Sequence, residues 1–117
     1  MSQKAIILSA VGVAAGGVAE ELILRIPRGY AETEWHRIVA RNATTDMTIV
    51  EIWVRVHAME YCLVGAAPGA LARTVHVNTS VIAPDDAQFV AKFTTAVAGD
   101  VLGLWAFGRE RDAPAEA

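Results

Sequence analysis

The sequence predicts an all-β fold, an antiparallel β-sandwich of the jelly-roll or Ig-like type with about seven or eight strands. Short segments rich in β-branched residues alternate apolar and polar side chains, as half-buried strands do. Clusters of turn-forming residues separate these segments roughly every 8–15 residues, a spacing typical of all-β sandwiches. The length of 117 residues suits a single domain.

The clearest strand covers residues 47–57. One of its faces is aliphatic, and the other carries Trp53 among charged residues. The aliphatic face consists of Val50, Ile52, Val54 and Val56. A turn cluster at 42–46 separates this strand from another at 34–41, because Asn and Asp side chains favour turns. The sequence therefore predicts a hairpin over residues 34–57.

Further strands are expected between the other turn signals. They cover residues 21–26, 61–64, 71–77 and 101–107. The segment 85–98 fits two structures. Its acidic beginning and the stop at Gly99 are typical of a short helix. The alternation of Phe89, Ala91 and Phe93 is typical of a strand, which is the structure we expect.

The N-terminal segment 1–18 is expected to be an arm or the first strand. Lys4 followed by the apolar run 5–15 has features of a secretory signal peptide, but we expect a structural segment that is not cleaved. The run is too short for a transmembrane helix, which needs about 20 apolar residues. The expected organisation is completed by a sandwich domain over 19–108 and a polar C-terminal tail over 109–117.

Composition argues against several classes of protein. Lys and Arg number 10 against 13 Asp and Glu, and the net charge of −3 with no basic run argues against a nucleic-acid partner. With 54% hydrophobic and 20% charged residues, the chain is too apolar for a disordered protein. The one cysteine, Cys62, excludes an intrachain disulfide and a CxxC metal site. We expect no nucleic-acid partner and no membrane association.

No catalytic, cofactor-binding or metal-ligating set stands out. Three histidines and the cysteine lack the local spacing of a zinc site, and we interpret the histidines as surface residues. These residues are His36, His57, His76 and Cys62. Cys62 has apolar neighbours and is expected to be buried and unreactive. Two aspartates at 85–86 close to Asp100 are a candidate cation site, although turn formation is the preferred interpretation. We expect no enzymatic activity, no cofactor and no metal.

The order of turn motifs along residues 20–107 resembles that of a known family. The motifs are Ile-Pro-Arg-Gly at 26–29, Asn-Ala-Thr at 42–44, Ile-Ala-Pro at 82–84 and Gly-Asp-Val-Leu at 99–102. This order is similar to that of the small β-sandwich structural proteins of tailed bacteriophages, which include capsid decoration proteins. The sequence departs from that pattern at 85–86, where two aspartates stand in place of the usual glycine. The resemblance implies a virion structural role, with no catalytic residues to carry over.

We expect a partner-binding surface made of apolar N-terminal residues and of aromatic residues on the polar faces of strands. Trp and Arg concentrate at the energetic centres of protein interfaces. The candidate residues are Ile6, Ile7, Leu8, Val11, Trp35, Trp53, Arg55 and Trp105. The alternative is that both faces of the strands are buried by an extra layer.

These expectations give a non-enzymatic virion protein, namely a trimeric capsid decoration (cement) protein that bridges capsomers of the major capsid protein. The alternatives are a tail, head–tail junction or fibre-associated protein, and a carbohydrate-binding module whose tryptophans stack on sugar rings. Removal of residues 1–18 is expected to abolish particle binding and leave the fold intact.

Overall fold

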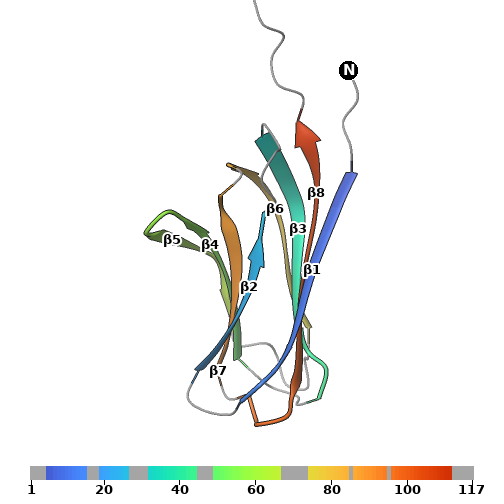
Figure 1. Ribbon diagram of the computed structural model, residues 1–117, viewed down its shortest axis with the longest axis vertical. Coiled ribbons are helices and arrows are strands. Elements are labelled where there is room, and N and C mark those ends of the chain that lie inside the picture. Colours follow the sequence, from blue (N-terminus) through green and yellow to red (C-terminus); the bar gives the residue numbers. More distant parts are fainter. Residues whose placement is uncertain are drawn as a thin grey trace, which may run out of the picture.

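The computed structural model describes residues 5–15, 19–26, 32–44, 49–66, 74–84, 86–94 and 96–111. Within these ranges the chain forms eight strands and no helix (Figure 1). The strands are β1 (Ala5–Val13), β2 (Ala19–Arg25), β3 (Glu32–Asn42), β4 (Ile49–Val56), β5 (Met59–Ala66), β6 (Thr74–Ala83), β7 (Gln88–Thr94) and β8 (Val101–Arg111). The prediction of an all-β sandwich is confirmed, and the segment 85–98 contains the strand β7.

The eight strands form two antiparallel sheets whose pairings are nested. One sheet has the order β1–β8–β3–β6 and the other the order β2–β7–β4–β5. The innermost pair is β4 with β5, followed outwards along the chain by β3 with β6, β2 with β7 and β1 with β8. The chain is thus one long hairpin rolled into two facing sheets, which is the jelly roll rather than the Ig-like arrangement.

The predicted hairpin over residues 34–57 is wrong. Its two strands, β3 and β4, lie in different sheets and do not pair with each other. The true hairpin partner of β4 is β5, which follows a two-residue turn at His57 and Ala58. His57 occupies the left-handed region there, with φ 55°. Neither residue is a typical turn former, so this turn could not be predicted from residue type.

Trp35 lies in the core, not on the polar strand face where the sequence analysis expected it. The register of β3 shifts at a bulge between Trp35 and Arg37. Because of the extra residue, Trp35 and Ile38 both point inward, although they are three positions apart, and both are fully buried. The Trp35 ring meets Phe89 edge-on, with centroids 5.4 Å apart, and its indole N–H donates to Thr33 Oγ1 at 2.8 Å. Trp35 is therefore unavailable to a partner.

The segment 5–13 is a strand of the sandwich. It pairs along its whole length with β8, from Ala5 opposite Arg109 to Val13 opposite Val101. Ile6 is buried in the core. Deletion of residues 1–18 would remove this strand, so we now expect that deletion to destabilise the fold rather than to spare it.

The C-terminal strand β8 continues to Arg111, past residue 108, where a polar tail was expected to begin. Residues 112–117 lie outside the described residues. The division of the chain at residues 18 and 108 stays a prediction in other respects.

One end of the sandwich is held by a buried polar pair. Asn42 Nδ2 donates to Asp100 Oδ2 at 2.9 Å, and both side chains are buried. The same carboxylate oxygen accepts from the Val97 N–H at 2.8 Å, and the Thr44 N–H donates to Asn42 Oδ1 at 3.0 Å. The Asn-Ala-Thr and Gly-Asp motifs, far apart in the sequence, thus meet and join the end of β3 to the turn before β8.

Candidate functional site

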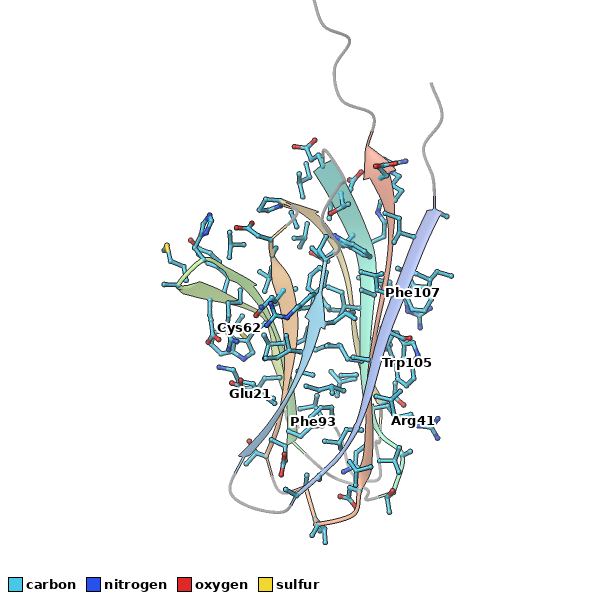
Figure 2. All side chains as sticks on the ribbon, viewed as in Figure 1. Glu21, Arg41, Cys62, Phe93, Trp105 and Phe107 are labelled. Carbon is cyan, nitrogen blue, oxygen red and sulfur yellow. The ribbon has the colours of Figure 1, made fainter. Side chains whose placement is uncertain are left out.

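The outer face of the β1–β8–β3–β6 sheet is largely apolar over β1 and β8, while β3 and β6 carry Arg37, Arg41 and His76 on the same side. Alternation along β1 and β8 places one set of side chains in the core and the other set on this outer side. We call the following outer set the apolar face: Ile7, Val11, Val13, Val101, Trp105 and Phe107. Ile7 and Val13 are each 68% exposed and Val11 is 66% exposed. Figure 2 shows Trp105 and Phe107 on the outer side of this sheet, whereas Phe93 lies between the sheets.

Trp105 lies flat on the apolar face because Gly103 leaves room for its ring. A Cβ atom added to Gly103 would come within 2.3 Å of the Trp105 Cη2 atom. Beside the ring is an open hollow of about 200 Å³. Its lining consists of Val11, Arg41, Ala43, Val101, Leu102, Gly103 and Trp105. The hollow is apolar except for the Arg41 side chain, and it is large enough to receive one side chain or one sugar ring from a partner.

At the far end of the same face, Glu34 accepts hydrogen bonds from two residues. Arg109 donates from Nε at 3.1 Å and from Nη2 at 2.8 Å to Glu34 Oε1, and the Ser80 hydroxyl donates to Oε2 at 2.9 Å. These bonds, from Arg109 first and Ser80 second, lower the pKa of Glu34 below its ordinary value. This cluster bounds the apolar face on one side.

The outer face of the β2–β7–β4–β5 sheet carries a network of charges. Arg55 Nε donates to Glu60 Oε2 at 2.6 Å, and Lys92 Nζ donates to Glu60 Oε1 at 2.9 Å. Glu21 lies 3.4 Å from Arg55 and 3.9 Å from Lys92. Lys92 and then Arg55 lower the pKa of Glu60, and Glu60 in turn raises the pKa of Arg55.

Trp53 belongs to this network. The Lys92 ammonium lies 4.4 Å from the centre of its ring, and its indole N–H donates to Glu51 Oε1 at 3.1 Å. Val90, opposite Trp53 in the register, is fully buried although it lies on the outer side of its strand. The charged and aromatic side chains of this sheet therefore cover their own apolar neighbours.

The structure brings together three of the eight residues expected at a partner interface. Ile7, Val11 and Trp105 share the apolar face. The other five lie elsewhere: Ile6, Leu8 and Trp35 face the core, while Trp53 and Arg55 belong to the charged network of the second sheet. The failure for Ile6 and Leu8 arises because a strand, unlike an arm, has only one outward face.

Sequence reasoning missed three members of the apolar face, namely Val13, Val101 and Phe107. The signal was present, since Phe107 and Val101 stand at even spacings from Trp105, and Val13 from Val11. Apolar residues on both sides of β1 and β8 were the sign that one sheet exposes an apolar surface.

Other candidate chemistry does not converge. No group of three or more His, Cys, Asp or Glu in the described part of the chain is placed to hold a metal ion. Asp100 is engaged with Asn42, and Asp85, the other part of the proposed cation site, lies outside the described residues. Cys62 is exposed, which contradicts the expectation that it is buried, and His57 Nδ1 lies 3.3 Å from Asp86 Oδ2 at the surface. No helix in the described ranges is long and apolar enough to cross a membrane.

Comparison with known proteins finds similarity in fold only. No family model and no curated protein matches the sequence. Among solved structures, the PRD1 vertex protein P5 matches with a TM-score of 0.57 and 9% identity, over 91% of this chain and 73% of that one. Murine APRIL matches with a TM-score of 0.50 and 11% identity, over 87% of this chain and 98% of that one. The infectious bursal disease virus Gx strain structure matches with a TM-score of 0.46 and 10% identity, over 97% of this chain and 38% of that one. The fold is therefore one that a viral vertex protein also uses.

Proposed function

We propose that the chain is a non-enzymatic structural component of a virion, a capsid decoration (cement) protein that binds the major capsid protein through the apolar face. The observation that carries this proposal is the exposed apolar surface over β1 and β8. Monomeric proteins rarely expose a contiguous apolar patch of this kind, and such patches mark interaction sites. The fold shared with the PRD1 vertex protein supports a place in a virion.

The chemistry of the apolar face suits protein–protein adhesion. Trp105 and Arg41, which flank the hollow, are of the residue types that dominate interface energetics. Ile7 and Val11 supply aliphatic surface, and burial of apolar area contributes about 25 cal/mol per Å². A protein seated across neighbouring capsomers in this way would stabilise the shell through many symmetric copies of one small contact.

The first test is the copy number in particles. Quantitative mass spectrometry of particles pelleted from the source culture would scale this chain against the major shell protein. A ratio near one, or a simple fraction that gives hundreds of copies, is expected for a decoration protein. A few dozen copies would place the chain in the tail, the head–tail junction or a fibre. Its absence from particles would overturn the virion proposal.

The second test separates the two outer faces with a matched pair of tryptophans. Trp105→Ala removes the centre of the apolar face, and Trp53→Ala removes a tryptophan of similar partial exposure from the other sheet. Cosedimentation with particles that lack the protein is expected to fall at least tenfold for Trp105→Ala and to stay near wild type for Trp53→Ala. Equal retention by both variants would refute the assignment of the binding face.

Carbohydrate binding is a second candidate function, favoured by the flat ring of Trp105 beside the hollow. A sugar ring stacks on an exposed aromatic face, and Arg41 would supply hydrogen-bond donors at its edge. Titration with glycans should then quench tryptophan fluorescence in the wild type and in Trp53→Ala but not in Trp105→Ala. Binding to particles with no response to glycans favours the decoration role.

A further inference from the structure

The strand β1 is the least protected of the four sheet edges. The edges of the two sheets are β1, β6, β2 and β5. Natural proteins protect such edges with charged residues, prolines or bulges. The strand β2 carries Glu20, Glu21 and Arg25, and the pairing of β5 and of β6 with their neighbours is interrupted by a bulge. β1 has no charged residue and no proline, and it pairs with β8 in unbroken register over 9 residues.

The hydrogen bonds on the two sides of β8 show which main-chain groups of β1 face outward. The Ala14 N–H donates to the Asp100 carbonyl at 2.8 Å on one side, and the Ala43 N–H donates to the Val101 carbonyl at 2.8 Å on the other. Successive residues of β8 therefore bond alternately to β1 and to β3, as antiparallel ladders require. It follows that the even-numbered residues of β1 bond to β8 and that the odd-numbered residues direct their N–H and C=O groups to the edge.

The outward residues of β1 are self-complementary when two copies of the strand lie antiparallel. They are Ala5, Ile7, Ser9, Val11 and Val13. An antiparallel copy related by a twofold axis at Ser9 would place Ile7 opposite Val11 of the second copy, and Ala5 opposite its Val13. The small Ser9 would meet its own copy at the centre, so that no large side chains collide. Each opposed pair exchanges two main-chain hydrogen bonds, about ten in all.

We propose that the free edge of β1 pairs with β1 of a second copy of this chain, in the register centred on Ser9. The two β1–β8–β3–β6 sheets then join into one sheet of eight strands. A twofold axis between antiparallel strands runs perpendicular to the sheet, so both apolar faces point to the same side. This twofold pair is an alternative to the trimer expected from the sequence. Its use on a capsid rests on the proposed function, but the pairing itself does not.

Cysteine cross-linking tests the register. In a Cys62→Ser background, Ser9→Cys would bring two thiols together across the axis, where opposed Cα atoms lie about 5.5 Å apart, within the range of a disulfide. Ile7→Cys is the matched control, because its own copy lies about four residues, or roughly 13 Å, along the strand. Rapid formation of a covalent dimer by Ser9→Cys alone is expected. Equal cross-linking of both variants, or of neither, would overturn the register.

A charge exchange tests the pairing without cross-linking. In the double variant Ile7→Lys with Val11→Lys, like charges face each other across the axis, and light scattering should give the mass of one copy. In Ile7→Lys with Val11→Glu, opposite charges face each other in the same register, and the mass of two copies should return. A wild type that stays a single copy at about 100 μM, or a larger assembly whose mass neither double variant changes, would overturn the proposal. A single copy would point to a strand of another protein at this edge.

These measurements use the purified chain and no particles. A failure of particle binding by Trp105→Ala therefore bears on the proposed function alone, and a failure of the edge variants bears on the pairing alone. Trp105→Ala is expected to keep the mass of two copies, because its side chain lies on β8 and not at the free edge.

Discussion

The outer face of the β2–β7–β4–β5 sheet is covered by the side chains of that sheet, whereas the outer face of the β1–β8–β3–β6 sheet is not. Val90 on the first is fully buried beside Trp53 and Lys92, and Val11 on the second is 66% exposed. Part of the difference comes from strand position, because β7 is a central strand and β1 is an edge strand. The rest comes from neighbouring charged residues that pair with each other over the apolar surface, as Arg55 and Glu60 do beside Val90.

This contrast suggests which side of the sandwich interacts with other molecules. A face whose charges are already paired gains little from a partner, because a partner would have to desolvate groups that have their hydrogen bonds. A face with exposed Ile7, Val11 and Val13 gains free energy from each apolar contact that it buries. The proposed function thus assigns the two sheets separate roles, with one covering its own apolar residues and the other binding a partner.

The largest difference in stability between the two faces is expected when Val90 and Val11 are each replaced by aspartate. Val90→Asp would bury a carboxylate without a designed partner and should lower the free energy of unfolding by about 3 to 5 kcal/mol. Val11→Asp should change it by less than about 1 kcal/mol, because the side chain stays in water. Urea unfolding measures both. If Val90→Asp fails to fold, Val90→Ala serves instead, with an expected loss of about 2 kcal/mol. Equal losses at Val90 and Val11 would show that the two faces are alike.

A smaller change in stability is expected when one arginine on each outer face loses its charge. Arg55→Met leaves Glu60 and Glu21 with fewer partners and should cost about 1 to 2 kcal/mol at low salt. Arg41→Met on the apolar face should leave stability within about 0.5 kcal/mol. Denaturation at low and high salt would test whether ion pairs cause the loss. Salt screens ion pairs, so the difference in free energy of unfolding between the two variants should become smaller at high salt. A gap that does not depend on salt would argue against the ion pairs as the source.

The turns that serve the two sheets should respond in opposite directions to substitution. Gly99, with φ 90°, precedes β8, and Gly99→Ala should cost about 1 kcal/mol, because L-residues with side chains disfavour that conformation. His57, with φ 55°, joins β4 to β5, and His57→Gly should gain up to about 1 kcal/mol despite the loss of its contact with Asp86. Thermal unfolding would reveal both shifts. A loss for His57→Gly would mean that its pair with Asp86 outweighs the strain of the turn.

The smallest change in stability is expected when the pH is lowered. Because hydrogen bonds to cations lower the pKa of folded Glu60 and Glu34, both contribute stability that is complete above their ordinary value near 4.5. That stability is lost as the pH falls through the lowered values, so unfolding titrations should be flat from pH 7 to about pH 5 and decline below. Glu60→Gln should flatten the decline more than Glu34→Gln, since Glu60 has two cationic partners and Glu34 one. If the loss of stability below about pH 5 is unchanged in both variants, Glu60 and Glu34 are not its cause.

The sequence sufficed for the strands whose pattern is local. Alternation located β4, β7 and β8, and it correctly separated the core side of β8 from the side with Trp105. It could not give the pairing, because the partners of a jelly roll lie at opposite ends of the sequence. The turn at His57 has no glycine or asparagine, so the β4–β5 hairpin was missed and a false one was assigned upstream.

The candidate site could be predicted only in part, again because strand pairing joins distant parts of the sequence. Ile7, Val11 and Trp105 were recognised as surface residues, but their common face depends on the pairing of β1 with β8. Trp35 was misplaced by a bulge of one residue, which a two-residue period does not reveal. The charged network over Val90 joins β2, β4, β5 and β7. No single segment of the sequence predicts it, because its members come from four strands.

The pairing of β1 with β8 also determines the order in which the molecule can be completed during synthesis. β1 ends at Val13 and is synthesised long before β8, the strand that covers its inner edge, which begins at Val101. At ordinary elongation rates the interval is roughly 5 to 20 s, far longer than a strand needs to find a partner. Throughout that time an apolar, uncharged strand is available to other nascent chains. The yield of folded protein should therefore depend on chaperones and on temperature. The free energy of unfolding of the folded protein would not show this dependence.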